Sequence, residues 1–165
     1  TEIYTLSLHD ALPISDPSIE LHSPDQLDQL LPRANVVHVC VPLTAETENL
    51  LDKRRLALLP DHAVVVNVAR GPVINEEALY CEVESGRLSA GIDVWYTYPQ
   101  TEPERGRTLP SRFPFQKLDN VVMTPHFASN SRETDSIQID ALASALNAII
   151  AGAELSHRVD PALGY

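Results

Sequence analysis

Cysteine is scarce in this chain of 165 residues. Cys40 and Cys81 stand far apart without a CxxC spacing, so the sequence predicts neither a disulfide framework nor a metal site. No apolar run is long enough to span a membrane, and no N-terminal stretch has the basic start and unbroken apolar core of a signal peptide. These absences favour a reducing, cytoplasmic setting and exclude a membrane partner.

Positive charge is also scarce. The chain has 12 lysines and arginines against 23 aspartates and glutamates, for a net charge of -11. This balance argues against binding to nucleic acid or to an anionic membrane surface. A hydrophobic fraction of 44% and this length allow one globular domain with its own core.

The first fifteen residues differ from the rest of the chain. The stretch from Glu2 to Ile14 resembles one reading frame of a common sequencing adapter, so we expect residues 1–15 to be a non-native leader. Natural sequence is then expected from about Asp16, and the chain is expected to be a fragment that starts within a fold. The stretch from Ile3 to Leu8 partly alternates in polarity, so it can be recruited as a strand.

From Asp16 onward, short apolar runs typical of strands alternate with helical patterns, which predicts a parallel α/β sheet. The expected strands are residues 19–21, 36–41, 63–68, 90–94 and 121–123. Capping residues predict helix starts at Ser23, Thr44, Asp52 and Asn75, and a further helix is expected from Asn130. The last helix runs to Ala151, with an apolar stripe of Ile137, Leu142, Ala145, Leu146 and Ile149.

Three features of this pattern carry specific expectations. The run 63–68 is nearly all apolar, which predicts a strand buried on both faces. His38 and Cys40 share one face of their strand and lack further ligands, so we expect them in the core. The stretch from Trp95 to Leu118 has no periodicity and predicts a long loop, of the kind that is usually functional or disordered.

Polar residues follow three successive strands. Arg70 comes after the run 63–68, Asp93 lies near the end of 90–94, and His126 follows 121–123. The carboxyl ends of parallel strands meet at one edge of a sheet, where ligands bind. Each residue alone fits an ordinary surface position equally well. Together, a carboxylate-binding arginine and a histidine that exchanges protons near neutral pH suit redox chemistry on a hydroxy or keto acid.

Four motifs carry a resemblance to a known family: Val41-Pro42-Leu43-Thr44, Asn67-Val68-Ala69-Arg70-Gly71, Gly91-Ile92-Asp93-Val94 and Pro125-His126-Phe127-Ala128. In this order and at about this spacing they resemble the D-isomer-specific 2-hydroxyacid dehydrogenases, from Asp16 to about Ala151. The resemblance implies a Rossmann-type NAD-binding domain beside a smaller substrate domain. It also implies hydride transfer between a nicotinamide and the C2 carbon of a 2-hydroxy or 2-oxo acid.

The same resemblance implies roles for individual residues. Arg70 would bind the substrate carboxylate, His126 would be the general acid/base, and Asp93 would hold the nicotinamide carboxamide. The positions that would line the cofactor, beside Arg70, Asp93 and His126, are Val41, Pro42, Val68, Ala69 and Ala128. The implied cofactor is NAD, with NADP as the alternative, and the implied assembly of the parent protein is a homodimer.

Two departures from the family pattern matter. Tyr98 stands where the family usually has the glutamate that pairs with the histidine, so Tyr98 becomes a third candidate catalytic residue. No GxGxxG motif occurs in the chain, nor the acidic residue that would hold the adenosine ribose. We therefore expect an incomplete Rossmann-type, doubly wound parallel sheet: a partial NAD-binding domain over residues 16–129, then a C-terminal helix and tail over 130–165. The alternative function is a non-enzymatic NAD-sensing scaffold or corepressor on the same fold.

An incomplete sheet has consequences for its strands. In the strand order 3-2-1-4-5-6, residues 19–21 correspond to strand 3 and lack their natural neighbour, so we expect them unpaired or misplaced. The strand 36–41 is expected to be an exposed apolar edge. The stretch from Ile3 to Leu8 is the candidate to fill this gap.

Overall fold

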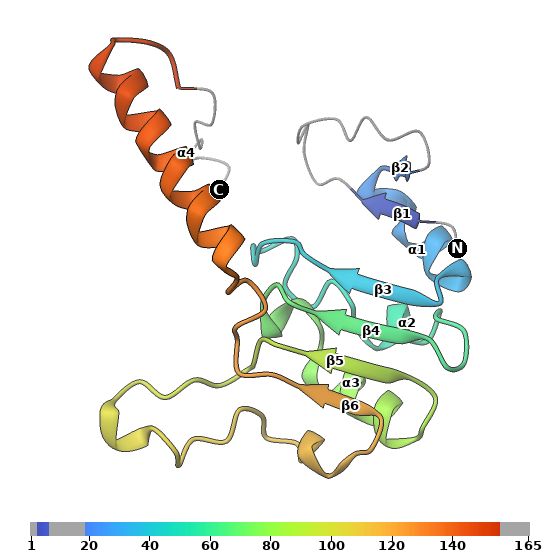
Figure 1. The fold of residues 1–165 in the computed structure, drawn as a ribbon. Helices are drawn as coiled ribbons and strands as arrows, with labels where there is room; N and C mark the ends of the chain where they lie inside the picture. The colour runs from blue at the N-terminus through green and yellow to red at the C-terminus, as the bar shows by residue number, and fades with distance from the viewer. Residues whose placement is uncertain (1–2, 7–18, 156–165) are drawn as a thin grey trace. The chain divides into compact units, whose positions relative to one another are not determined.

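The computed structural model describes residues 3–6 and 19–155 (Figure 1). These residues belong to two compact units, which meet in sequence between Pro125 and His126. The first unit holds every strand among the described residues, and the second is built around one long helix.

Four parallel strands form the main sheet of the first unit. They are β3 (Val36–Val39), β4 (Val64–Asn67), β5 (Ser89–Ile92) and β6 (Val121–Met123). The strands lie in chain order, β3-β4-β5-β6, and every neighbouring pair is parallel. The predicted parallel α/β architecture is confirmed, and each strand begins and ends within two residues of its expected range.

Short helices connect these strands. After β2 (Ile19–His22) come the 3-10 turn η1 (Pro24–Gln26), α1 (Leu27–Leu30) and the 3-10 turn η2 (Leu31–Arg33). The helix α2 (Lys53–Leu56) begins after Asp52, whose carboxylate accepts a hydrogen bond from the Arg55 N–H at 2.8 Å. The helix α3 (Glu76–Glu84) begins after Asn75, which caps the Ala78 N–H at 3.0 Å. Two of the five expected helix starts, those at Asp52 and Asn75, are therefore confirmed as local capping effects already visible in the sequence.

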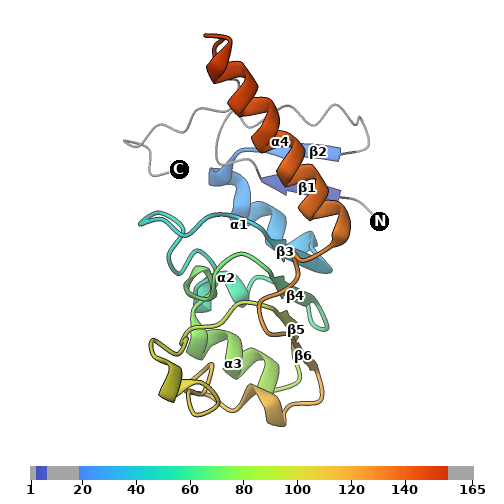
Figure 2. The same cartoon turned by 60° about the vertical axis from the view of Figure 1, so that its left-hand side comes forward.

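The two faces of the main sheet have different surroundings. The helices α2 and α3 lie on the same side of the sheet (Figures 1 and 2). On this covered face the side chains of Val65, Ala90 and Ile92 are buried. On the opposite face, here named the open face, Val36 and Val122 are 61% and 68% exposed. Along β4 the residues therefore alternate between half-buried and buried.

This asymmetry corrects two predictions. The run 63–68 is buried on one face only, because the helices of the first unit that the structure describes lie on one side of the sheet. His38 and Cys40 are exposed and not in the core, because both lie on the open face. Their side chains are adjacent there, with 3.4 Å between Cys40 Sγ and His38 Nδ1.

The N-terminal strands form a separate, two-stranded sheet. The strand β1 (Ile3–Leu6) pairs in parallel with β2 over all four residues. Residues 19–21 are expected to be unpaired or misplaced. The first alternative is wrong, because β1 satisfies the backbone groups of β2 on one side, and β2 does lie outside the main sheet. Ile3 to Leu6 form a strand as expected, but the prediction that this stretch fills the gap beside the strand 36–41 is wrong, because β1 pairs with β2 and not with β3. Leu8 lies outside the described residues. β1 does not extend the main sheet, so β3 remains its outer strand there.

The segment after Thr44 forms a turn and not the expected helix. The Glu48 N–H donates to the Thr44 carbonyl at 2.9 Å, which closes one helical turn. Asn49 then adopts the left-handed conformation, with φ at 52°, and the helix cannot continue. The Thr47 hydroxyl donates to the Pro42 carbonyl at 2.6 Å, so this buried side chain fixes the loop after β3.

The long loop between β5 and β6 has only two 3-10 turns, η4 (Glu102–Glu104) and η5 (Phe115–Lys117), and is held firmly against α3. The Glu76 carboxylate accepts hydrogen bonds from the Ser111 hydroxyl at 2.7 Å and the Arg112 N–H at 3.1 Å. At the start of the loop, the Tyr96 hydroxyl donates to the Ile74 carbonyl at 3.1 Å. Burial and the nearby Glu76 carboxylate raise the pKa of Tyr96, so its phenol stays a neutral donor.

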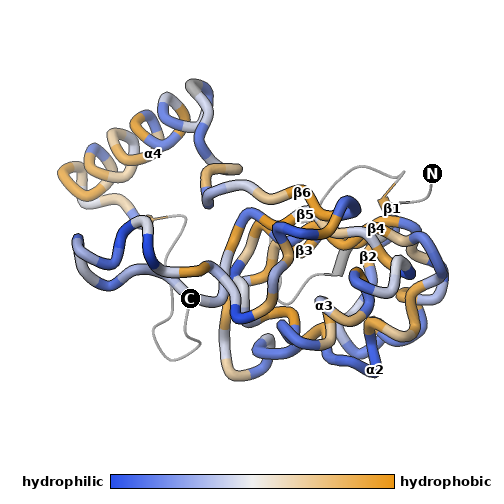
Figure 3. Tube along the Cα trace, turned by 90° about the horizontal axis from the view of Figure 1, so that it is seen from below, coloured by the Kyte–Doolittle hydropathy of each residue, from blue (hydrophilic) through white to orange (hydrophobic). Residues whose placement is uncertain are grey.

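The second unit contains α4 (Arg132–Ile150), which begins after Ser131 and ends just before Gly152. The Ser131 hydroxyl accepts a hydrogen bond from the Thr134 N–H at 3.0 Å. Apolar and polar residues alternate along this helix (Figure 3), and most residues of the expected apolar stripe are exposed: Ile137, Leu142, Leu146 and Ile149. Over the described ranges, none of the helices has the length and apolar character needed to cross a membrane.

Candidate functional site

The carboxyl ends of β4, β5 and β6 lie side by side in the first unit. Beyond the paired strands, the Asp93 N–H donates to the Asn67 carbonyl at 3.0 Å, and the Thr124 N–H donates to the Ile92 carbonyl at 2.9 Å. Both bonds continue the parallel ladder past the last paired residues. The arrangement brings the Arg70 turn, Asp93 and Thr124 to one edge of the sheet, as the strand-end pattern predicts.

The Arg70 turn is shaped by a buried asparagine. Asn67 Nδ2 donates to the Arg70 carbonyl at 3.0 Å, and Asn67 Oδ1 accepts from the Ala69 N–H at 3.1 Å. Asn67 lies on the covered face, where a polar side chain without such bonds would be costly. The Arg70 side chain itself is exposed and donates from Nη1 to the Ala69 carbonyl at 2.6 Å. A guanidinium has five donors, so this bond leaves capacity for a carboxylate.

Glycine at position 71 allows this turn to approach the chain that follows β5. A Cβ atom built on Gly71 would overlap the Trp95 carbonyl oxygen and lie 2.6 Å from its carbonyl carbon. Any larger residue would therefore push the Arg70 turn away from the chain that follows Asp93. This contact is the physical reason for a glycine directly after Arg70.

Asp93 is a buried carboxylate with a close hydrogen-bond donor. Asp93 is only 4% exposed, and its Oδ1 atom accepts a hydrogen bond from the Thr124 hydroxyl at 2.6 Å. The Trp95 indole N–H donates to the Thr124 carbonyl at 3.0 Å. Asp93, Trp95 and Thr124 thus form one connected network at the edge of the sheet.

Tyr98 takes part in the same region through its hydroxyl. The Tyr98 oxygen accepts a hydrogen bond from the Trp95 backbone N–H at 2.9 Å, and the ring is partly exposed. The phenol therefore fixes the start of the long loop against the end of β5. Its catalytic role stays a prediction.

His126 is the first residue of the second unit, two positions after Thr124 in sequence. It is exposed, and its φ of 59° lies in the left-handed region. Such a conformation is uncommon for a residue other than glycine and often marks a functional position. Ala128, predicted to line the cofactor, is also exposed in this unit.

The remaining predicted cofactor positions differ in burial. Val41 and Val68 are half-buried, Ala69 is buried in the core, and Pro42 is exposed. Val41 packs against the core, and the Val68 N–H donates to the Val39 carbonyl at 3.4 Å. Val41 and Pro42 therefore follow β3, the strand that pairs with β4. Val68 and Ala69 follow β4 and directly precede Arg70 in the sequence.

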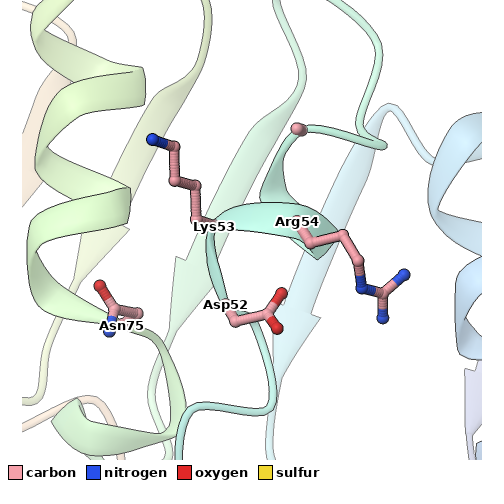
Figure 4. Close-up of a pocket in the computed structure, with 5 residues that line it drawn as sticks. Asp52, Lys53, Arg54 and Asn75 are labelled. Carbon is pink, nitrogen blue, oxygen red and sulfur yellow. The ribbon is translucent and has the colours of Figure 1, made fainter.

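A surface hollow lies elsewhere, between the starts of α2 and α3 (Figure 4). Asp52, Lys53, Arg54, Ala57 and Asn75 line it. Asp52 and Asn75 are committed to capping these helices, and Arg54 donates to Asp28 at 2.7 Å. None of the predicted site residues lines this hollow. Among the described residues, no group of His, Cys, Asp and Glu side chains is placed to hold a metal ion.

Sequence reasoning missed the supporting residues of this edge: Asn67, Trp95 and Thr124. Asn67 offered a signal, since it is the one polar side chain inside the apolar run 63–68. Thr124 and Trp95 gave none, because their partners are 31 and 29 residues away in sequence.

Comparisons with known proteins agree with this geometry. The family model described as D-isomer specific 2-hydroxyacid dehydrogenase, NAD binding domain, matches residues 7–128. The chain is 39% identical to a hydroxypyruvate reductase of Thermotoga maritima over 108 residues, which are 65% of this chain and 33% of that protein. It is 37% identical to a glyoxylate reductase of Thermofilum pendens over 127 residues, which are 76% of this chain and 35% of that protein.

A solved structure is similar over nearly the whole chain. The crystal structure of a D-isomer specific 2-hydroxyacid dehydrogenase from Xanthobacter autotrophicus Py2, in complex with NADPH and MES, gives a TM-score of 0.79 at 31% identity. The match covers 99% of this chain and 63% of that one. The chain thus spans about a third of the length of the curated relatives. It belongs to the D-isomer specific 2-hydroxyacid dehydrogenase family, and its matched part is the NAD-binding domain.

Proposed function

We propose that the whole protein is an NAD(P)-dependent oxidoreductase that transfers hydride between a nicotinamide and the C2 carbon of a 2-hydroxy or 2-oxo acid. The observation that carries this proposal is the edge formed by β4 and β5. There an exposed arginine on a fixed turn stands beside a strand that ends in a buried carboxylate. Such an edge of an open α/β sheet is the ordinary place for a ligand.

Arg70 binds the substrate carboxylate in this proposal. Its backbone is held by Asn67 and by the packing of Gly71 on Trp95, while its side chain is exposed. A planar guanidinium on a rigid turn suits a bidentate contact to a carboxylate. This bidentate contact orients the acid, because it fixes the position of the C2 carbon relative to the carboxyl ends of β4 and β5.

Asp93 fits the carboxamide of a nicotinamide. A carboxylate is an acceptor with two oxygens, of which Oδ1 accepts the Thr124 hydroxyl, and an amide N–H₂ group is a donor of the kind that it accepts. When bound, the nicotinamide supplies or takes up the hydride. Asp93 holds its carboxamide, while Val41, Pro42, Val68, Ala69 and Ala128 line the cofactor. The family name supports NAD, and the similar Xanthobacter structure contains NADPH, so both are proposed.

His126 exchanges the proton that accompanies the hydride. Reduction of a 2-oxo acid adds a hydride to C2 and a proton to the carbonyl oxygen, and His126 donates that proton. Oxidation of the 2-hydroxy acid reverses both transfers, with neutral His126 as the base. Imidazole is the side chain suited to both directions near neutral pH.

Tyr98 is the proposed substitute at the family's glutamate position. A phenol lacks the charge by which a carboxylate stabilises an imidazolium, so the reduction should fade at a lower pH than in relatives with glutamate. Tyr98→Glu should then move the alkaline limb of kcat/KM for reduction upward, by about one pH unit. Arg70→Lys is the control, since it should weaken substrate binding and leave the limb in place.

The remaining proposals concern the setting of the protein. We propose a cytoplasmic homodimer, with residues 1–15 as a non-native leader, 16–129 as part of the NAD-binding domain and 130–165 as a return toward the substrate domain. The substrate class is the small 2-oxo acids, which the names of the similar hydroxypyruvate and glyoxylate reductases support.

A rate measurement tests the function. The whole protein is mixed with NADH or NADPH and a panel of 2-oxo acids, glyoxylate and hydroxypyruvate included, and the absorbance of the reduced nicotinamide is followed. We expect turnover that Arg70→Ala and His126→Ala each reduce at least a hundredfold. Cofactor binding without turnover on any acid would contradict the enzyme and favour an NAD-sensing scaffold.

The 165-residue chain alone should behave differently. It has no glycine-rich turn at a helix start to hold a pyrophosphate, so we expect NAD to bind only in the millimolar range, about -4 kcal/mol or weaker. We also expect no turnover. Calorimetry that gives micromolar affinity for this chain would contradict both expectations.

A further inference from the structure

We propose that Thr124 is a positioning residue, which fixes the Asp93 carboxylate as the acceptor for the nicotinamide carboxamide, and that Trp95 holds Thr124 in place. This inference rests on the proposed function, because it assumes that a nicotinamide lies against Asp93. It assigns roles to two residues for which the sequence pattern gave none.

The first step is the contact between Thr124 and Asp93. The Thr124 hydroxyl donates to Asp93 Oδ1 at 2.6 Å, a length typical of hydrogen bonds from a hydroxyl to an ionised carboxylate. Asp93 is buried, so water does not compete freely for this oxygen. A short, charge-assisted bond of this kind restricts rotation of the carboxylate about its last torsion angle.

The second step is the rigidity of Thr124. Its backbone N–H donates to the Ile92 carbonyl at 2.9 Å, and its own carbonyl accepts the Trp95 indole N–H at 3.0 Å. Threonine is branched at Cβ and has few accessible rotamers, so fixing its backbone also fixes its hydroxyl. The donor therefore has one direction relative to β5, and Asp93 has one preferred orientation.

The third step is the position of Trp95. Its side chain is buried, and its backbone N–H donates to the Tyr98 hydroxyl at 2.9 Å. Its carbonyl is the group against which Gly71 packs. One residue thus contacts the Arg70 turn through its backbone and the Asp93–Thr124 pair through its indole. The orientation of Asp93 is consequently set relative to the turn that carries Arg70.

The consequence is selectivity for a carboxamide. A carboxylate held in one orientation accepts well from an amide N–H₂ group and repels a carboxylate at the same place. The 165-residue chain should therefore prefer NAD⁺ over deamido-NAD⁺, in which the carboxamide is replaced by a carboxylate. Loss of the Thr124 hydroxyl should weaken binding of NAD⁺ more than it weakens binding of deamido-NAD⁺, so the preference should fall.

The test compares the two dinucleotides on variants of the 165-residue chain, by ligand-observed NMR suited to millimolar affinities. For Thr124→Val we expect the ratio of the NAD⁺ and deamido-NAD⁺ affinities to fall about fivefold. Thr124→Ser keeps the hydroxyl and should restore most of the ratio. Trp95→Phe removes the indole donor, keeps an aromatic ring of smaller size and should lower the ratio about twofold.

Ser111→Ala is the matched control. It also removes a hydroxyl that donates to a carboxylate, here that of Glu76 at 2.7 Å, outside the proposed nicotinamide site. We expect its affinity ratio to equal that of the wild type. Urea unfolding of each variant identifies any that fails to fold. If Thr124→Val does not fold, Thr124→Ala, which also lacks the hydroxyl, carries the comparison.

Three results would overturn the inference. An unchanged ratio in folded Thr124→Val would show that the hydroxyl does not position Asp93. An equal loss of both dinucleotides would show a structural effect only. Absence of a wild-type preference for NAD⁺, or of any dinucleotide binding by this chain, would remove the proposed contact of Asp93. The turnover measurement on the whole protein tests the proposed function separately.

Discussion

The two faces of the main sheet are built from the same strands and have opposite surroundings. Val65 and Val66 are neighbours in β4, yet Val65 is 1% exposed among the helices while Val66 is only half-buried on the open face. Both faces present valine, so composition does not distinguish them. The difference lies in what covers each face. An apolar strand sequence therefore indicates that both faces can be buried, but not that both are.

The largest expected effect concerns an enclosed glycine and an open one. Gly71→Ala should lower the free energy of unfolding by about 3 kcal/mol or more, because a Cβ there overlaps the Trp95 backbone. Gly91→Ala is the control on the open face, where a Cβ would lie 3.6 Å from the nearest Val66 methyl group. It should leave stability unchanged or raise it by up to about 1 kcal/mol. Urea unfolding measures both, and equal losses would contradict the contrast.

The next effect separates the two faces within one strand. Val65→Ala should lower the free energy of unfolding by about 2 kcal/mol, since it removes buried methyl groups and leaves a cavity. Val66→Ala should cost about 1 kcal/mol or less. The same urea titration serves for both. A larger loss at Val66 would mean that the open face is covered in solution.

A smaller effect concerns the helices near the covered face. Asp28 on α1 pairs with Arg54 and Arg55 on α2, at 2.7 and 2.8 Å. These hydrogen bonds lower the pKa of Asp28 to about 2, from 3.8. Its contribution to stability is therefore present above pH 3.8 and is lost as the pH falls through 2.

Asp28→Asn tests this acid dependence. The variant should lose less stability than the wild type when the pH is lowered through that window, while Asp25→Asn on the preceding turn should follow the wild type. Thermal unfolding at a series of acid pH values gives the comparison. If the stability of Asp28→Asn and that of the wild type fell equally as the pH is lowered, the ion pairs of Asp28 with Arg54 and Arg55 would not be stabilising.

The smallest effect concerns a cysteine beside the open face. Burial raises the pKa of the Cys40 thiol, although the residue is exposed in part. In a Cys81→Ser background, labelling of Cys40 by a thiol reagent should therefore require a higher pH than labelling of a cysteine in a short peptide. Labelling at the peptide's pH would show that this face is more hydrated than the structure indicates.

The sequence predicted those parts of the structure that depend on local interactions. Caps at Asp52 and Asn75 and the strand periodicity set most element boundaries, because neighbouring residues determine them, while the last helix starts after Ser131, one residue beyond the expected Asn130. The placement of Arg70 and Asp93 at one edge followed from parallel topology alone. The pairing of β1 with β2, the exposure of His38 and the network around Thr124 depend on residues distant in sequence, which periodicity does not detect. The turn after Thr44 depended on one left-handed residue, Asn49.

Trp95 is the only tryptophan of the chain, and it lies buried within the proposed site. Its intrinsic fluorescence is therefore a local optical reporter that needs no label. Indole emission overlaps the absorption of a reduced nicotinamide, so quenching of this emission by NADH would report occupancy of the edge directly. The same signal would follow unfolding of the edge alone, and its comparison with circular dichroism would show whether the site unfolds together with the sheet.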